Sequence, residues 1–110
     1  MIVFNPTEKT WAEIYISRQN RLIINWPVIG VEKHECDSNG FKKEMYCLVI
    51  SRNGVKGIVP IYETDIKEAL YPELTQLKLI NFIGETMPVI VIEIQKDYFI
   101  ASKLEALKKI

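Results

Sequence analysis

Two cysteines and one histidine are the residues best suited to nucleophilic or metal chemistry. Cys36 and Cys47 are the only cysteines, and they form no C-x-x-C pair of the kind that holds zinc. His34 is the only histidine, and Cys36 is the one cysteine at ligand spacing from it. One imidazole and one thiol are too few ligands for a structural metal site. We therefore expect reduced thiols, no bound metal and no cofactor.

The sequence also lacks the common signatures of catalysis. It has no G-x-S-x-G elbow, no P-loop and no paired histidines. Cys47 falls inside an expected strand, and the single histidine gives little support for a cysteine–histidine nucleophile. We expect a protein that is not an enzyme.

Tyrosine, lysine and arginine offer a different chemistry, because tyrosine rings stack on bases and basic groups contact phosphates. The chain has 5 tyrosines, but its 14 Lys and Arg are cancelled by 14 Asp and Glu. A domain that binds nucleic acid mainly by neutralising phosphates is usually clearly basic. Any nucleic-acid binding must therefore depend on a local patch or on stacking.

Length and composition are those of one globular domain. The chain has 110 residues, of which 48% are hydrophobic and 25% charged. No run approaches the ~18 apolar residues of a membrane span, and the N-terminus lacks a signal-peptide pattern. We expect a cytoplasmic protein with no membrane association.

The strongest local signal is Asn53-Gly54, because both central residues of a type I′ turn need positive φ. It predicts a hairpin that joins strands at 45–50 and 55–61. The polar segment 32–44, of mixed charge, is interpreted as a long, solvated hairpin tip. Before it, residues 22–31 read as a first strand, interrupted at Trp26-Pro27 because proline cannot donate to a ladder.

Details of this first strand indicate how it bends and what it buries. Gly30 provides a second place for the strand to kink, as closure of a small barrel requires. Trp26 is interpreted as a core residue rather than a ligand platform.

Three helices are expected around the strands. Asn5-Pro6-Thr7-Glu8 is a capping sequence that starts a helix over 6–19. Its apolar face is formed by Trp11, Ile14 and Tyr15. A short helix is predicted over 63–71, with Thr64 as its cap and Pro72 ending it. The third begins at Lys103.

The remaining strands complete the predicted domain. Residues 87–94 form a strand with an almost wholly apolar centre, so both of its faces should be covered. A turn at 95–97 leads into a fifth strand over 98–102. We divide the chain into an N-terminal helical extension (1–21), a barrel (22–104) and the start of a helix or linker to a further domain (105–110).

Five short strands, with a short helix between the third and fourth, predict a mostly β, five-stranded OB-type barrel. Three blocks resemble the S1 RNA-binding domain family. Residues 55–63 (VKGIVPIYE) resemble its V-E-G-h-V-H-I-S-E block, and 82–89 (FIGETMPV) resemble its entry to strand four. Residues 91–94 through 101–103 resemble its V-x-x-I-D…L-S-x-K close. The resemblance covers about residues 26–103.

The resemblance implies weak, sequence-tolerant binding of single-stranded RNA across strands two, three and five. On strand two, either Tyr46 or Leu48 takes the family's aromatic place, and Pro60 stands where the family has histidine. Tyr98 stands near the basic position of strand five. The expected face comprises Tyr46, Arg52, Lys56, Tyr62, Tyr98 and Lys103.

A protein-interaction or assembly module that keeps the barrel but has lost the RNA face is the alternative. Pro60, the zero net charge and the apolar face of the first helix favour it. A positive, tyrosine-rich face on strands two, three and five would favour RNA, whereas a mixed or apolar face would favour protein.

Overall fold

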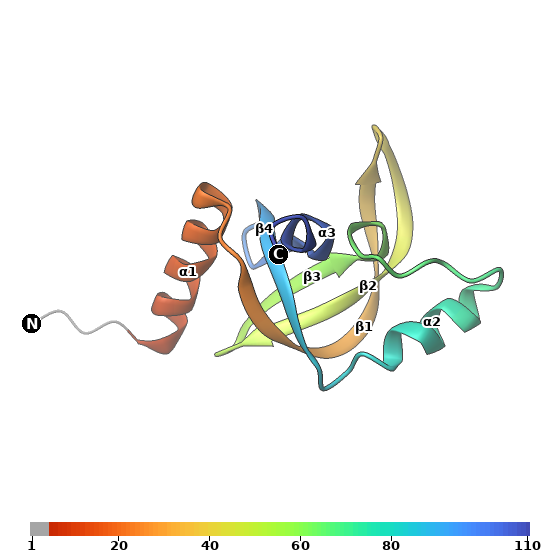
Figure 1. Ribbon diagram of the computed structural model, residues 1–110, viewed down its shortest axis with the longest axis horizontal. Coiled ribbons are helices and arrows are strands. Elements are labelled where there is room, and N and C mark those ends of the chain that lie inside the picture. The colour runs from red at the N-terminus through yellow and green to blue at the C-terminus, as the bar shows by residue number, and fades with distance from the viewer. Residues whose placement is uncertain (1–4) are drawn as a thin grey trace, which may run out of the picture.

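A computed structural model describes residues 5–110, the side chain of Ser38 excepted, and contains a five-stranded sheet with helices on opposite sides (Figure 1). The strands are β1 (Ile24–Ser38), β2 (Phe41–Arg52), β3 (Val55–Pro60), β4 (Thr86–Ile94) and β5 (Tyr98–Ser102). They close into a barrel in the order β1-β2-β3-β5-β4, because β4 pairs back onto β1. Only the β3–β5 pairing is parallel among these strands. The predicted number of strands is confirmed.

The turns of the hairpins explain one success and one error of the sequence interpretation. Asn53 and Gly54 have φ of 52° and 79°, as a type I′ turn requires. The segment 32–44 is not a loop, because β1 and β2 run through it and only Asn39 and Gly40 turn, again with positive φ. Asp37 lies opposite Lys42 in this ladder, and Lys33 Nζ lies 3.9 Å from Glu44 Oε1, although Glu35 faces Glu44. Opposite charges placed across strands stabilise the pairing. The hairpin therefore extends beyond the barrel.

The interior of the barrel is built around Trp26 and Phe99. Both are fully buried, and their rings meet edge to face with centroids 5.1 Å apart. Phe99 lies so close to Gly57 that an added Cβ there would be 2.3 Å from the ring. β1 is continuous through Trp26-Pro27 and bends at an irregularity in register between Val28 and Gly30. The core role of Trp26 and the kink near Gly30 are confirmed.

The first helix, α1 (Pro6–Asn20), forms where the capping sequence predicts it. The Glu8 N–H donates to Asn5 Oδ1 at 2.8 Å. The predicted apolar face is only partly right, because Ile14 is buried while Tyr15 is exposed. Ser17 is also buried on the barrel side of α1, where its Oγ accepts a hydrogen bond from the Val91 N–H of β4 at 3.1 Å. A polar contact to the barrel backbone thus takes part in docking α1.

The predicted helix over 63–71 is wrong. A 3-10 turn, η1 (Ile61–Glu63), is followed by an irregular segment, and α2 (Pro72–Ile80) comes later. Pro72 starts this helix instead of ending one, because the first helical residue needs no N–H donor. Thr64 is not an N-cap but the C-cap of η1, where its N–H donates to the Ile61 carbonyl and its Oγ1 accepts from the Ile66 N–H. A helix between β3 and β4 is present, but one segment later than expected.

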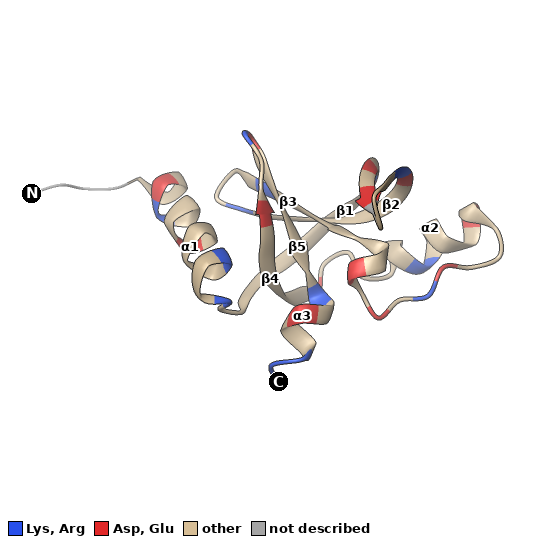
Figure 2. Ribbon diagram, turned by 90° about the horizontal axis from the view of Figure 1, so that it is seen from above, with Lys and Arg blue, Asp and Glu red and all other residues tan. Residues whose placement is uncertain are grey.

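The C-terminal elements agree with the prediction. β5 occupies 98–102, and α3 (Lys103–Leu107) follows it directly. Ser102 caps α3 by accepting from the Glu105 N–H at 3.0 Å. Figures 1 and 2 both place α1 and α2 on opposite sides of the barrel.

Candidate functional site

The β1–β2 hairpin presents two different faces, because successive side chains of a strand point to opposite sides. Glu32 and His34 lie on one face of β1, and Lys33 lies on the other. Lys33 is opposite Tyr46 in the ladder, so these two side chains share a face. We define the outer-face cluster as Glu32, His34, Lys56 and Tyr98. We define the Tyr46 pocket as the cavity on the Lys33 side.

Glu32 links the outer-face cluster. Lys56 Nζ of β3 donates to Glu32 Oε1 at 2.6 Å, and His34 Nε2 lies 2.8 Å from the same oxygen. These contacts, that of Lys56 first, hold the pKa of Glu32 below its ordinary value, although partial burial opposes them. The side chains of Lys56 and His34 remain 41% and 27% exposed, so a ligand can reach them.

Tyr98 completes the cluster from β5. The parallel pairing of β3 with β5 sets Lys56 directly beside Tyr98. The His34 ring is tilted by 30° to the Tyr98 ring, with centroids 6.3 Å apart. A phenol, an imidazole and an ammonium group therefore meet on a partly exposed surface formed by three strands. This set can stack on a planar ligand and contact an anion.

The surface next to Tyr98 is of mixed charge. A cavity of about 420 Å³ adjoins the cluster and is lined by Glu35, Cys36, Asp37, Lys42, Glu93, Gln95, Tyr98 and Ile100. Three of these residues are acidic and one is basic. Acidic and basic positions also alternate along much of the ribbon without gathering into one basic side (Figure 2).

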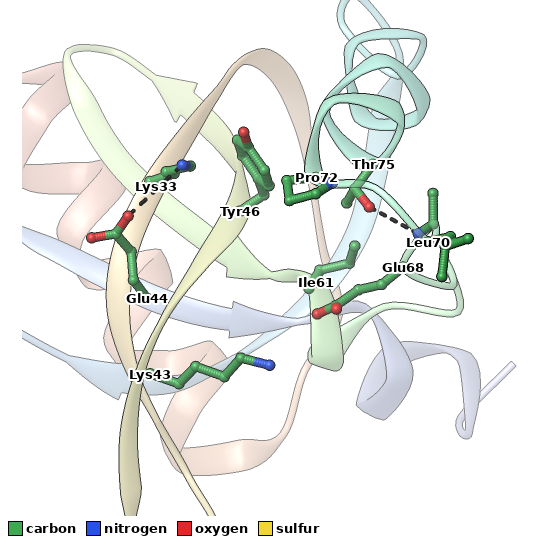
Figure 3. A pocket seen from close by; sticks show the side chains of 10 residues that line it. Lys33, Lys43, Glu44, Tyr46, Ile61, Glu68, Leu70, Pro72 and Thr75 are labelled. Carbon is green, nitrogen blue, oxygen red and sulfur yellow. Dashed lines mark hydrogen bonds and ion pairs between the residues drawn. The ribbon is translucent and has the colours of Figure 1, made fainter.

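The Tyr46 pocket lies between the hairpin and the start of α2 and has a volume of about 280 Å³ (Figure 3). It is lined by Lys33, Lys43, Glu44, Tyr46, Ile61, Glu68, Ala69, Leu70, Pro72 and Thr75. Lys33 Nζ lies 5.0 Å from the centre of the Tyr46 ring, so a cation already occupies one face of that ring. Tyr46 is therefore less available for stacking than Tyr98.

Arg52 and Lys103 lie away from both sites and connect elements of the fold. Arg52 Nη2 donates to the Asn25 carbonyl at 2.8 Å, and its guanidinium lies 5.7 Å from the Trp26 ring. Lys103 Nζ lies 2.9 Å from Asp65 Oδ1, and its side chain is only 15% exposed. Both side chains have intramolecular partners.

Tyr62 lies just beyond β3 and fixes the hairpin. Its hydroxyl donates to the Asp37 carbonyl at 2.9 Å. Burial, as the largest cause, raises the pKa of this phenol. The ring is 40% exposed, but its hydroxyl is engaged within the protein.

The structure thus brings together only two of the six predicted residues, Lys56 and Tyr98. Tyr46 lies on the opposite face of the hairpin. Glu32 and His34 belong to the site but were not expected there, because segment 32–44 was interpreted as a loop. Their spacing of two residues is the signal that could have placed them on one face of a strand.

Comparisons with known proteins give no family for this chain. No protein-family model matches it, and neither the curated proteins nor the solved structures include a match. Within residues 5–110, no group of three or more His, Cys, Asp or Glu could hold a metal ion. Over the same residues, no helix is both long and apolar enough to cross a membrane.

Proposed function

We propose that the chain is an OB-type barrel of the S1-like kind and that it binds single-stranded RNA through the outer-face cluster. The closed strand order β1-β2-β3-β5-β4, with α2 between β3 and β4, supports this assignment. OB folds are partly open five-stranded barrels that bind oligonucleotides across their strands and neighbouring loops.

The observation that carries the proposal is the meeting of Tyr98, His34 and Lys56. Unpaired bases stack on tyrosine and histidine rings, and lysine follows the phosphate backbone. In the S1 resemblance, the histidine of strand three is replaced by Pro60, which is buried opposite Cys47. His34 supplies an imidazole from β1 instead. The imidazole that the resemblance implies on strand three is thus provided by another strand.

Glu32 should make this binding weak. Its carboxylate already pairs with Lys56 and His34, so a phosphate must compete with it for both groups. The adjoining acidic cavity adds repulsion. Because few phosphates are neutralised, the dependence of affinity on salt should be shallow but present.

Fluorescence anisotropy with labelled single-stranded RNA tests this function. We expect weak binding that decreases as salt increases, and no comparable binding to a duplex of the same length. Tyr98→Ala should lower affinity roughly ten-fold, since stacking contributes ~1–3 kcal/mol per base. Tyr46→Ala is the matched control on the other face and should change affinity little. Absence of binding at low salt would overturn the proposal.

Assembly with protein is the second candidate, and the exposed surface around α2 favours it. Six large apolar or aromatic side chains there are 42–87% exposed: Leu70, Tyr71, Leu74, Leu77, Ile80 and Ile83. Contiguous apolar patches of this kind often mark interaction sites. If this candidate is right, light scattering should detect self-association or a partner complex that Leu77→Gln abolishes. Ile29→Gln, at an exposed residue of β1, is the control. Association unaffected by Leu77→Gln would contradict it.

A further inference from the structure

Two buried thiols, one from β1 and one from β2, lie in contact. Cys36 Sγ of β1 and Cys47 Sγ of β2 are 3.8 Å apart. Neither forms a disulfide, and they are 5% and 0% exposed. The proposed RNA binding uses neither of them.

The two cysteines differ in their access to solvent. Cys36 lines the cavity of about 420 Å³ beside Tyr98, whereas Cys47 does not line it. Cys36 is thus the cysteine nearer to solvent, although only 5% exposed, and Cys47 is its neighbouring thiol. A neighbouring thiol is what a sulfenic acid needs in order to condense to a disulfide.

We propose that Cys36 and Cys47 form a site of reversible oxidation, at which a small peroxide converts the pair into an intramolecular disulfide. The Cys36 thiolate attacks one peroxide oxygen, the O–O bond breaks, and Cys36 becomes a sulfenic acid as hydroxide leaves. The Cys47 sulfur then attacks the Cys36 sulfur, loses its proton, and releases the sulfenic oxygen as water. In total, two thiols and one hydrogen peroxide give one disulfide and two waters.

The geometry gives this modification a structural consequence. The ladder sets Cys36 opposite Lys43 and Cys47 opposite Glu32, so the two cysteines are not directly paired. The two positions are four residues out of register. Because a disulfide has a sulfur separation of about 2.05 Å, closing the 3.8 Å gap should draw β1 and β2 together here. Glu32 and His34 lie on the same β1 segment and should move with it. A disulfide formed under such strain is readily reversed by a dithiol.

The local environment determines how fast oxidation occurs. Burial raises the pKa of the Cys36 thiol, and burial raises that of Cys47 further. The nucleophilic thiolate is therefore scarce at neutral pH. We expect slow oxidation by peroxide and little alkylation of the folded protein by bulky reagents.

Mass spectrometry of the folded, full-length chain treated with hydrogen peroxide tests the proposal. We expect a monomer that has lost two hydrogens, whose cysteines resist alkylation after denaturation and which dithiothreitol restores. Cys47→Ser should instead accumulate a sulfenic acid at Cys36 that dimedone traps. Cys36→Ser should show no dimedone adduct at Cys47. These readouts are independent of RNA binding.

Other outcomes would overturn the proposal. These are a disulfide only between chains, a sulfinic acid at Cys36 without a disulfide, or an intramolecular disulfide that forms only in urea. If a serine variant fails to fold, the wild-type time course with and without urea decides the question alone. The proposal requires that the disulfide form in native buffer and that the circular dichroism spectrum stay unchanged until it has formed.

Discussion

The two faces of the β1–β2 hairpin contain similar residues but offer them differently. Each face has a tyrosine and a lysine of the barrel, with a glutamate close by. On one face, Lys33 covers Tyr46 and the start of α2 closes over it. On the other, Lys56 is held beside Tyr98 by Glu32 and strand pairing, and the rings of Tyr98 and His34 lie next to each other. The availability of a side chain to a ligand thus depends more on which strand presents it, and on which face of that strand it lies, than on its residue type.

The largest expected effect concerns the contact that aligns β3 with β5. Gly57→Ala would place a Cβ 2.3 Å from the buried Phe99 ring. Overpacking of this kind costs about 1–3 kcal/mol or more. We expect a lower free energy of unfolding in urea titrations and loss of the Lys56–Tyr98 alignment, and therefore of RNA affinity.

Gly30→Ala is the control for this substitution. An added Cβ at Gly30 meets nothing within 4 Å, and its φ is not in the left-handed range. Its stability should stay within ~0.5 kcal/mol of the wild type. Equal losses in the two variants would show that the Phe99 contact does not align the outer face.

A smaller effect is expected when one carboxylate is removed from each face of the hairpin in turn. Glu32→Gln removes the carboxylate that occupies Lys56 and His34, so RNA should bind about three-fold more tightly, the order of one exposed charge interaction. Glu44→Gln is the matched variant on the other face, where the carboxylate lies 3.9 Å from Lys33 Nζ. Its effect in the same anisotropy assay should be smaller. Equal tightening would mean that only net charge matters.

The smallest effect is a pH dependence of stability. The pKa of Glu32 is lowered from its ordinary value of 4.5, mainly by the hydrogen bond from Lys56. Its stabilising contribution is therefore fully present above the unfolded-state pKa and is lost as pH falls through the folded-state pKa. Because the pair is well exposed, we expect less than ~1 kcal/mol. Urea unfolding of wild type and Glu32→Gln should converge at acid pH; a difference independent of pH would contradict this.

Local signals predicted much of the fold. Asn53-Gly54 and the Asn5 cap each depend on backbone conformations or hydrogen bonds that few residues provide, so sequence alone located them. The helix around Pro72 was misplaced because proline both follows helices and starts them. A hairpin tip over 32–44 was predicted, but its paired strands were missed because the charges suggested a solvated loop.

The candidate site was less predictable because it depends on pairing between distant segments. Lys56 meets Tyr98 only through the parallel β3–β5 ladder, and His34 joins them only because β1 continues beyond the barrel. The sequence gives no local sign of either contact. Arg52 has the right chemistry for a phosphate contact, but its intramolecular partners could not be seen before the fold.

Backbone amide shifts of isotope-labelled protein, followed while single-stranded RNA is added, test the central claim most directly. The outer-face cluster predicts the largest changes at Glu32, His34, Lys56 and Tyr98, and small changes around Tyr46 and the start of α2. Changes confined to Tyr46 and residues 69–75 would place the RNA on the opposite face of the hairpin and contradict the account.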